Sequence, residues 1–354
     1  MGVAVMSALP SMVVSNAYDP AFCPHPPIRQ YRPSAWETEW RTKHVLRVQR
    51  GVSAKIPRSL QWWTKGCAQM RRNASATHAW LLFAQARRPM RRNANARLAS
   101  SEPPAPSEEA AQVTSCHALV DACTGHELAL VPIEPLVGFL RHPEAHCHHG
   151  DPWPYVWSKD YLLPPWRTEA WPRGGPTRSQ TSAFFFDLGA SLYDKGAGGA
   201  STKWFVDQYR ARGIDFDRLY AWESTSHTDA EIYAAMPAAI IDRISYYNLP
   251  VDSNAGKKHN PWRTLRAVAV PRDFVVVKID IDNSPIEETL IAELLADRAL
   301  AGLVDELYFE HHVHDSPMWR YGWQANTVTN QTLEHSYGLF GKLREMGIRA
   351  HSWV

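Results

Sequence analysis

The chain has 354 residues, of which 45% are apolar, as is usual for a globular protein. Its charges are unevenly divided. Residues 1–100 carry 16 Lys and Arg against three Asp and Glu, a net charge of +13, and the remaining residues carry a net charge of −11. The five scattered cysteines exclude a disulfide framework. No stretch approaches the roughly 18–20 apolar residues of a membrane-spanning helix, so no transmembrane segment is expected.

Residues 1–110 show no sustained hydrophobic period and end in a stretch rich in Pro and Ser. We expect a basic, largely disordered leader followed by a linker. Because this region is nearly free of acids, organelle targeting stays open, although we favour a soluble intracellular protein. Binding of nucleic acid by the basic region is not favoured. The sequence does not indicate the oligomeric state.

Residues 111–181 combine prolines with large aromatic residues. Seven prolines between positions 143 and 176 preclude long helices. The same stretch holds five aromatic residues that a disordered tail would not need: Trp153, Tyr155, Trp157, Tyr161 and Trp166. We interpret the segment as an irregular bridge that packs on the domain after it.

From Ser182 the pattern changes to short apolar runs that alternate with helical stretches. Strands are predicted at residues 183–189, 216–222, 240–247, 273–282, 307–313 and 348–353, and helices at residues 201–212, 284–296 and 331–346. Ser284 and Pro285, with Glu287 three residues after the serine, predict a helix N-cap and a capping box. Residues 182–354 are therefore expected to form a doubly wound, mostly parallel α/β sheet of the Rossmann type.

Ligands of such sheets bind outside the carboxyl ends of the strands. The predicted strands end in polar or charged residues, which buried strands do not need for stability. These residues are Asp187, Gly189, Glu223, Asn248, Asp280, Asp282, Glu310, His311 and His312. A glycine after the first strand permits a tight turn, and an acid after the second can accept hydrogen bonds from ribose hydroxyls. The pattern favours a nucleoside-binding site.

The segments FFFDLGAS, LYAWES, VVVKIDIDNSPIEETLIAEL and ELYFEHHV resemble the FkbM-like branch of the S-adenosylmethionine-dependent methyltransferases. The resemblance covers residues 182–354 and implies a class I methyltransferase fold with S-adenosylmethionine as cofactor. Two departures from the family's pattern are the longer segment Leu192 to Gly199 and the variant Asp282-Asn283-Ser284-Pro285. The second departure, together with the ending GIRAHSWV, resembles algal and plant proteins of undefined activity. A catalytically degenerate binding protein therefore stays open as an alternative.

The resemblance assigns roles to the residues that match its motifs. Asp187 and Gly189, with Ala190 and Ser191 in the same turn, would bind the methionine part of the cofactor. Glu223 would hold the ribose. We add Asn248, at the end of the third strand, to this set of cofactor-binding candidates.

The candidate catalytic residues are Asp280, Asp282, Glu310 and His312, because a hydroxyl acceptor needs a base to remove its proton. Alternation along a strand predicts that Asp280 and Asp282 share one face, as do Glu310 and His312. The four could bind a divalent cation. We favour ion pairing with Lys278 and neighbouring groups instead, and we assign no metal ligand.

The acceptor is expected to be a small molecule or a saccharide, and Trp319, Tyr321 and Trp323 could line its pocket. A metal-dependent glycosyltransferase using the motif Asp280-x-Asp282 is an alternative enzyme. A second possible metal cluster has spacings that fit zinc sites only loosely. Its members are Cys116, Cys123, His126, His142, His146, Cys147, His148 and His149.

Overall fold

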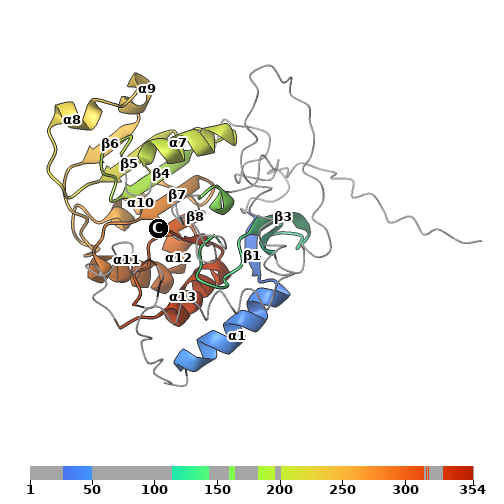
Figure 1. Cartoon of the computed structure of the whole chain (residues 1–354). Coiled ribbons are helices and arrows are strands. Elements are labelled where there is room, and N and C mark those ends of the chain that lie inside the picture. Colours follow the sequence, from blue (N-terminus) through green and yellow to red (C-terminus); the bar gives the residue numbers. More distant parts are fainter. Residues whose placement is uncertain are drawn as a thin grey trace, which may run out of the picture.

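The computed structural model describes residues 27–49, 114–142, 159–163, 182–195, 201–314, 316, 318 and 330–353. Within these residues the strands form two sheets, one parallel with six strands and one antiparallel with three (Figure 1). None of the helices in the described part of the chain is long and apolar enough to span a membrane. The aromatic residues Trp153, Tyr155, Trp157, Trp166, Trp319, Tyr321 and Trp323 lie outside the described residues.

Every neighbouring pair of strands in the larger sheet is parallel. Its strands are β4 (Ala183–Leu188), β5 (Arg218–Trp222), β6 (Ile244–Tyr247), β7 (Phe274–Ile279), β8 (Glu306–Phe309) and β9 (Arg349–Ser352). Their spatial order is β6-β5-β4-β7-β8-β9, so the chain builds outward from β4 and then outward in the other direction from β7. This order is found in doubly wound Rossmann sheets. The predicted α/β class with a mostly parallel sheet is confirmed.

Helices cover both faces of the sheet. On one face, Phe205 of α7 (Thr202–Ala211) contacts Phe185 of β4 and Tyr308 of β8. On the other face, Phe309 of β8 contacts Phe340 of α13 (Leu333–Glu345). Because successive residues of a strand point to opposite faces, α7 and α13 lie on opposite sides of the sheet.

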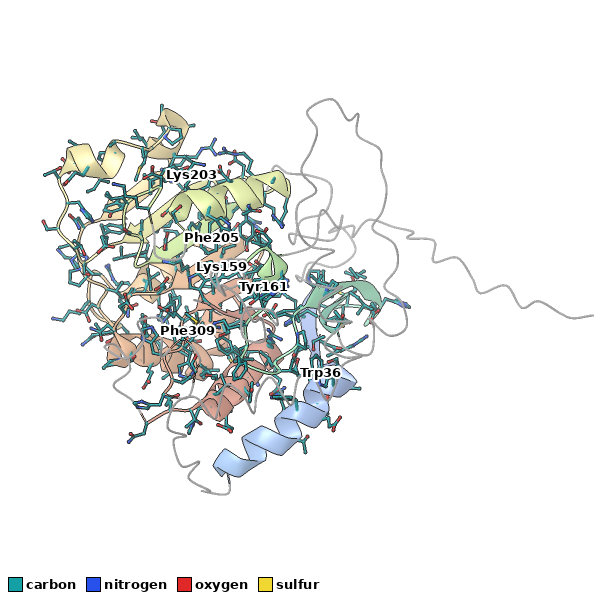
Figure 2. The ribbon with its side chains drawn as sticks, in the orientation of Figure 1. Trp36, Lys159, Tyr161, Lys203, Phe205 and Phe309 are labelled. Carbon is teal, nitrogen blue, oxygen red and sulfur yellow. The ribbon has the colours of Figure 1, made fainter. Side chains whose placement is uncertain are left out.

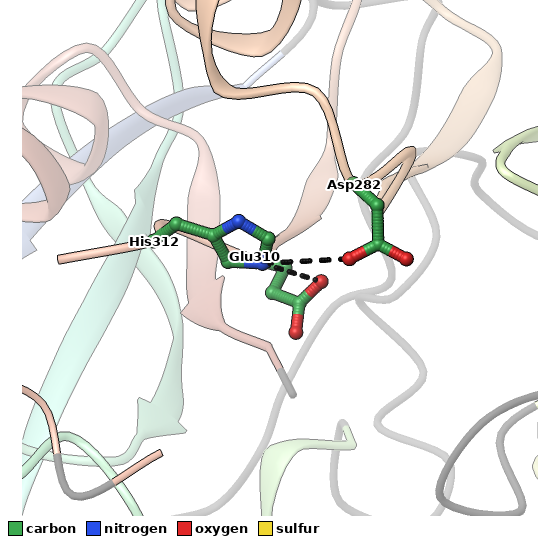
Figure 3. Close-up of side chains that lie close together, drawn as sticks. All are labelled: Asp282, Glu310 and His312. Carbon is green, nitrogen blue, oxygen red and sulfur yellow. Dashed lines mark ion pairs between the residues drawn. The ribbon is translucent and has the colours of Figure 1, made fainter. Parts of the chain in front are cut away.

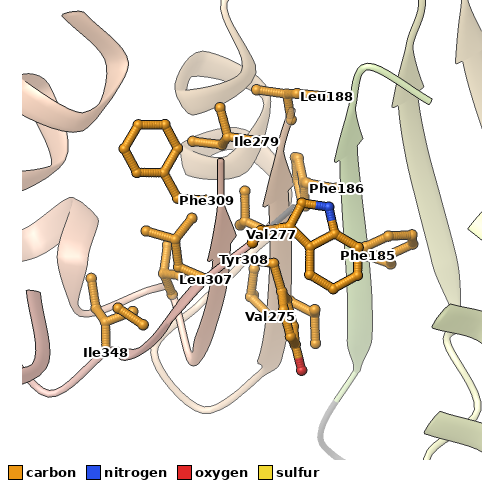
Figure 4. Close-up of a cluster of buried hydrophobic side chains, with 14 of the residues drawn as sticks. Phe185, Phe186, Leu188, Val275, Val277, Ile279, Leu307, Tyr308, Phe309 and Ile348 are labelled. Atoms are coloured by element: carbon orange, nitrogen blue, oxygen red, sulfur yellow. The ribbon is translucent and has the colours of Figure 1, made fainter. Parts of the chain in front are cut away.

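The core lies along the central strands. All six residues of β4 and all six of β7 are buried. Figure 4 shows Val275 and Val277 beside Phe186 of β4 and Leu307 of β8. A strand buried on both faces does not alternate between apolar and polar residues, which explains the unbroken Val and Ile run of β7.

The remaining helices connect these strands. They are α8 (Asp229–Tyr233), α9 (Ala238–Ile241), α10 (Pro261–Val268), α11 (Ser284–Ala296) and α12 (Arg298–Ala301). Three elements differ from the prediction. The predicted strand at residues 240–247 begins as α9, β7 stops at Ile279, and β8 stops at Phe309, so the polar residues after β7 and β8 lie in turns. Helix α11 is capped by Asn283, whose side chain accepts a hydrogen bond from the Ile286 N–H, and not by Ser284.

Residues 28–49 fall in the predicted low-order leader, and there the prediction is wrong. They form β1 (Ile28–Arg32) and α1 (Ala35–Gln49). Strand β1 pairs with β2 (Ser115–Val120), which pairs with β3 (Glu127–Ile133), both antiparallel. Their stability comes from distant partners: Arg29 forms a buried ion pair with Asp305, and the buried Trp40 contacts Tyr337 of α13 edge to face. The hydrophobic periodicity of residues 28–49 does not predict contacts with residues so far away in the chain.

The predicted bridge is described in two pieces, residues 114–142 and 159–163. The second piece contains the short 3₁₀ helix η1 (Asp160–Leu162). Leu136, Val137, Tyr161 and Leu162 all belong to the buried hydrophobic core that includes the α/β sheet. The Arg141 guanidinium donates to the Trp353 carbonyl oxygen, at 2.8 Å, next to the end of β9. These residues therefore cover part of the carboxyl edge of the sheet.

Candidate functional site

The order of the strands locates the candidate site. The chain changes direction between β4 and β7, and in doubly wound sheets this switch point opens a crevice at the carboxyl ends. Asp187 of β4 is paired in register with Lys278 of β7 at this point. The polar residues predicted at the strand ends are therefore collected along one edge of the sheet.

The turn after β4 is tightly packed against β7. Gly189 has a φ of +84°, and a Cβ atom on it would lie 1.7 Å from the Asp280 carbonyl oxygen. The N–H groups of Gly189 and Ala190 both donate to the Trp222 carbonyl oxygen at the end of β5, each at 3.0 Å. Ser191 follows in the left-handed region with a φ of 52°. Backbone conformations that disfavour side chains tend to occur where function requires them.

Glu223 connects this turn to the end of β5. Its carboxylate accepts hydrogen bonds from the Ser191 N–H at 2.8 Å and from the Thr225 N–H at 2.6 Å, one on each oxygen. The Asn248 amide after β6 donates to the Glu223 carbonyl oxygen and accepts from the His227 N–H. Asn248 thus shapes the turn after β5. Each Glu223 oxygen keeps capacity for a second hydrogen bond, because a carboxylate offers about four lone-pair positions.

A buried ion cluster lies at the switch point. The Lys278 ammonium is 3.0 Å from Asp187 Oδ1, 3.5 Å from Asp280 Oδ2 and 2.8 Å from the Gly189 carbonyl oxygen. Thr202 of α7 donates to the second Asp187 oxygen at 2.7 Å. Burial lowers the pKa of Lys278, but the charges of Asp187 and Asp280 outweigh it and hold that pKa above its usual value. Lys278 is therefore a permanent cation that anchors both acids.

Asp280 and Glu310 form a carboxyl–carboxylate pair beside Lys278. The Trp353 indole N–H donates to Asp280 Oδ2 at 3.1 Å, and the Asp280 and Glu310 side chains are hydrogen-bonded to each other. Burial opposes ionisation of Asp280, yet Lys278 and these hydrogen bonds hold its pKa below the usual value. Burial and the charge of Asp280 raise the pKa of Glu310 well above its usual range. Asp280 is therefore the more acidic member of the pair.

The His312 imidazole lies near two acids that follow different strands, Glu310 after β8 and Asp282 after β7 (Figure 3). Its Nε2 atom is 3.1 Å from Glu310 Oε2 and 3.8 Å from Asp282 Oδ1. Potential ligand atoms of Asp282, Glu310 and His312 all lie within 4.8 Å of one another. Burial lowers the pKa of His312, but the hydrogen bond to Glu310 and the charges of Glu310, Glu287 and Asp282 raise it to about 9. The imidazole therefore carries a proton at neutral pH.

Asp282 and His311 do not follow the strand alternation assumed from the sequence. Asp282 lies beyond the end of β7, with a φ of 56° and a side chain that is 65% exposed. His311 points away from the acids: its ring nitrogens bond to the Ser336 hydroxyl at 2.9 Å and the Gln331 side chain at 2.8 Å. The left-handed turn at Asp282, rather than strand pleating, brings its carboxylate toward His312.

Three further residues contribute to this edge and were not assigned to it from the sequence. Lys159 and Tyr161 reach it from the segment around η1 (Figure 2), and the buried Lys159 ammonium lies 5.1 Å from the centre of the Trp353 ring. Burial lowers the pKa of Lys159 to about 8, although Asp280 partly offsets that effect. The third residue is Glu287. A lone Lys in an aromatic segment was the available signal for Lys159, whereas Glu287 was interpreted as a helix cap.

Glu287 in the first turn of α11 is fully buried. Its Oε1 atom accepts a hydrogen bond from the Ile281 N–H at 2.9 Å, so it holds the turn that carries Asp282. Its Oε2 atom has no hydrogen-bond partner among the described residues. Burial raises the pKa of Glu287 to about 7, while the Ile281 N–H and the charge of His312 act in the opposite direction.

The described members of the Cys/His cluster do not assemble into a metal site. Cys116 is a free cysteine, Cys123 is disulfide-bonded, and His142 is buried against the Tyr161 ring. Among the residues that the structure describes, Asp282, Glu310 and His312 form the one group of three potential ligands. His146, Cys147, His148 and His149 lie outside those residues.

The edge therefore has two neighbouring parts. One is a backbone turn with an anchored acid, Glu223, suited to a hydroxyl-rich ligand, and the other is an acid-rich cluster suited to proton transfer or a cation. The chain matches no protein-family model, no curated protein and no solved structure.

Proposed function

We propose that the protein binds S-adenosylmethionine at the carboxyl ends of β4 and β5 and transfers its methyl group to an oxygen atom of a small molecule or a saccharide. The observation that carries the proposal is the Glu223 carboxylate beside the Gly189 turn. Two backbone N–H groups fix its oxygens, and each oxygen can accept one more hydrogen bond. That is what the two hydroxyls of a ribose require.

Methyl transfer demands little beyond alignment, because the sulfonium carbon is already activated. The acceptor oxygen attacks the methyl carbon, the carbon–sulfur bond breaks with its electrons going to sulfur, and the hydroxyl proton must leave. Asp280 is the base that we assign. It is ionised beside Lys278, its side chain is 22% exposed, and it lies next to the Gly189 turn. His312 is protonated at neutral pH and so does not act as the initial base.

A glycosyltransferase with Asp280 and Asp282 as paired metal ligands finds less support. Asp280 contacts Lys278 and Trp353, while Asp282 lies near His312 and Glu310. The group of potential metal ligands thus includes Asp282 without Asp280. A degenerate binding protein is favoured by the two departures from the family's motifs, and the binding experiment distinguishes it from an active enzyme.

The test is calorimetric titration of the full chain with S-adenosylmethionine, beside Glu223→Ala and Glu223→Gln. Loss of a hydrogen bond to a charged group should weaken binding by about 1.5–3 kcal/mol, which is roughly tenfold or more. Glu231→Ala is the matched control, because Glu231 is an exposed acid in α8 whose hydrogen bonds within the described part of the chain are to Thr228 of the capping box. Thermal melting establishes that each variant is folded.

Two results would sink the proposal. The first is a folded wild-type chain that does not bind S-adenosylmethionine. The second is binding that Glu223→Ala leaves as tight as Glu231→Ala does, because the ribose would then not contact Glu223. Binding of the cofactor without any methyl transfer to hydroxyl-bearing acceptors would favour the degenerate binding protein.

A further inference from the structure

The acid-rich cluster gathers several carboxyl groups around one imidazole, that of His312. Asp280 is paired with Lys278, but three more acids surround His312. They are Asp282, Glu287 and Glu310. Collecting like charges in a partly buried place is costly unless a cation offsets them.

We propose that Asp282, Glu310 and His312 form a binding site for a divalent transition-metal cation of the Mn²⁺ or Zn²⁺ type. One ligand atom from each residue lies within 4.8 Å of the others, a span that one ion can bridge by small side-chain rotations. Figure 3 shows both carboxylates on the side of the imidazole ring that carries the Nε2 atom. Carboxylate oxygens suit hard cations and an imidazole nitrogen suits transition metals, so the mixed set favours Mn²⁺ or Zn²⁺ over Mg²⁺.

Glu287 provides an independent reason to place a cation here. It is fully buried, and its Oε2 atom has no hydrogen-bond partner among the described residues. It lies close enough to His312, Asp280 and Asp282 for their charges to act on its carboxyl group. A buried carboxylate oxygen without a donor is costly. A bound cation, or water bound to that cation, supplies what this oxygen lacks.

The backbone also positions the site. Asp282 adopts the left-handed region, where Asp is tolerated better than most residues, and the Glu287 side chain fixes the preceding Ile281 N–H. Asp282 is largely exposed, whereas His312 and Glu310 are buried. Two ligands on the protein side and one at the surface leave the outer positions of the ion open to water or to an acceptor. A metal-bound hydroxyl loses its proton more easily than a free one.

Metal binding does not depend on the proposed function, although the metal's role toward an acceptor hydroxyl rests on it. The experiment is titration of the metal-stripped full chain with Mn²⁺, without S-adenosylmethionine, followed by the electron paramagnetic resonance signal of free Mn²⁺. We expect about one bound ion per chain, displaced by Zn²⁺ and not by an equal concentration of Mg²⁺.

Variants distinguish binding of Mn²⁺ at this site from nonspecific attraction of the ion to surface charge. Asp282→Asn should weaken Mn²⁺ binding about tenfold or more without loss of folding, because this side chain is exposed. Glu287→Gln keeps an acceptor for the Ile281 N–H and should weaken binding roughly 10–100-fold, as changes beside metal ligands do. Asp229→Asn, an exposed acid at the start of α8, should have no effect.

Three results would overturn the site: no Mn²⁺ or Zn²⁺ binding at millimolar concentrations, Asp282→Asn binding as tightly as Asp229→Asn, or displacement of Mn²⁺ by equal Mg²⁺. Binding of Mn²⁺ by a chain that does not bind S-adenosylmethionine would support the metal site and remove the proposed function. A chain that binds S-adenosylmethionine but does not bind Mn²⁺ would support the proposed function and remove the metal site.

Discussion

Replacement of Gly189 by Ala tests how the candidate site is built. A Cβ atom at this position would lie 1.7 Å from the Asp280 carbonyl oxygen and 2.6 Å from its carbon, both backbone atoms that cannot rotate away. The residue also has a φ of +84°. The left-handed backbone costs a residue with a side chain about 1–2 kcal/mol, and forced separation of packed elements costs about 1–3 kcal/mol. We expect a total loss of roughly 2–5 kcal/mol, a large part of the usual about 5–15 kcal/mol.

Urea unfolding followed by tryptophan fluorescence measures this loss, and two other glycines divide it into its parts. Gly125 has a φ of +72° with nothing within 4 Å of its Cβ position, so Gly125→Ala should cost only the about 1–2 kcal/mol of backbone strain. Gly256 has neither the strained φ nor a contact closer than 3.4 Å, so Gly256→Ala should stay within about 1 kcal/mol of the wild type. If Gly189→Ala costs no more than Gly125→Ala, the close approach of the β4 turn to Asp280 is refuted.

Two further predictions concern buried charges. Lys278→Met should destabilise the chain by about 3–5 kcal/mol in urea unfolding, because it leaves Asp187 buried without its cation. Adding Asp187→Asn should restore part of this stability. A Lys278→Met variant as stable as the wild type would contradict this reasoning. Burial is the largest cause that holds the pKa of His117 well below its usual value, and Arg349 and other cations lower it further. The His117 imidazole therefore binds a proton more readily in the unfolded chain than in the folded one. The free energy of unfolding should therefore fall as the pH drops below about 6.5, and His117 should contribute up to about 1.4 kcal/mol per pH unit to this fall. His117→Leu should show a shallower decline, and an unchanged decline would exclude His117 as a cause.

The strands and helices of the α/β sheet could be predicted because each carries its own signal. The apolar run of β7 and the helix from Ser284 to Ala296 follow from local composition and spacing. Strand β1 and helix α1 could not be predicted in this way. Arg29 and Trp40 are stabilised by Asp305 and Tyr337, more than 270 residues away in the chain. A basic segment without an amphipathic pattern is predicted to be disordered, because its sequence does not indicate the distant residues that stabilise it.

The candidate site was predictable as a set of strand ends but not in its geometry. The sequence brings Asp280, Glu310 and His312 to one edge because parallel strands end together. It does not show that Asp282 adopts a left-handed backbone conformation. Nor does it show that the Glu287 side chain bonds to the Ile281 N–H of this turn instead of completing a capping box in α11. Both depend on single backbone conformations, which hydrophobic patterns do not encode.

The protein contains a second buried charged cluster, and its composition is informative. It lies where the three-stranded sheet meets β8, β9 and α13. Arg29 pairs with Asp305, Arg349 pairs with Glu306, and Arg344 and His351 both contact Glu134. Each of these acids has a cation at contact distance, so ion pairs hold the N-terminal strands in place.

The carboxyl edge of the sheet is built differently although it belongs to the same fold. Lys278 contacts both Asp187 and Asp280, and the His312 imidazole interacts with Asp282, Glu287 and Glu310. The charges of Arg141 and Lys159 also act on Glu310. At this edge two acids share each of the cations Lys278 and His312, whereas each acid of the other cluster has a cation at contact distance. Shared cations and shifted pKa values beside a strained turn are typical of sites that bind a cation or remove a proton. The difference between the two clusters therefore supports the proposal that a ligand binds at the ends of β7 and β8.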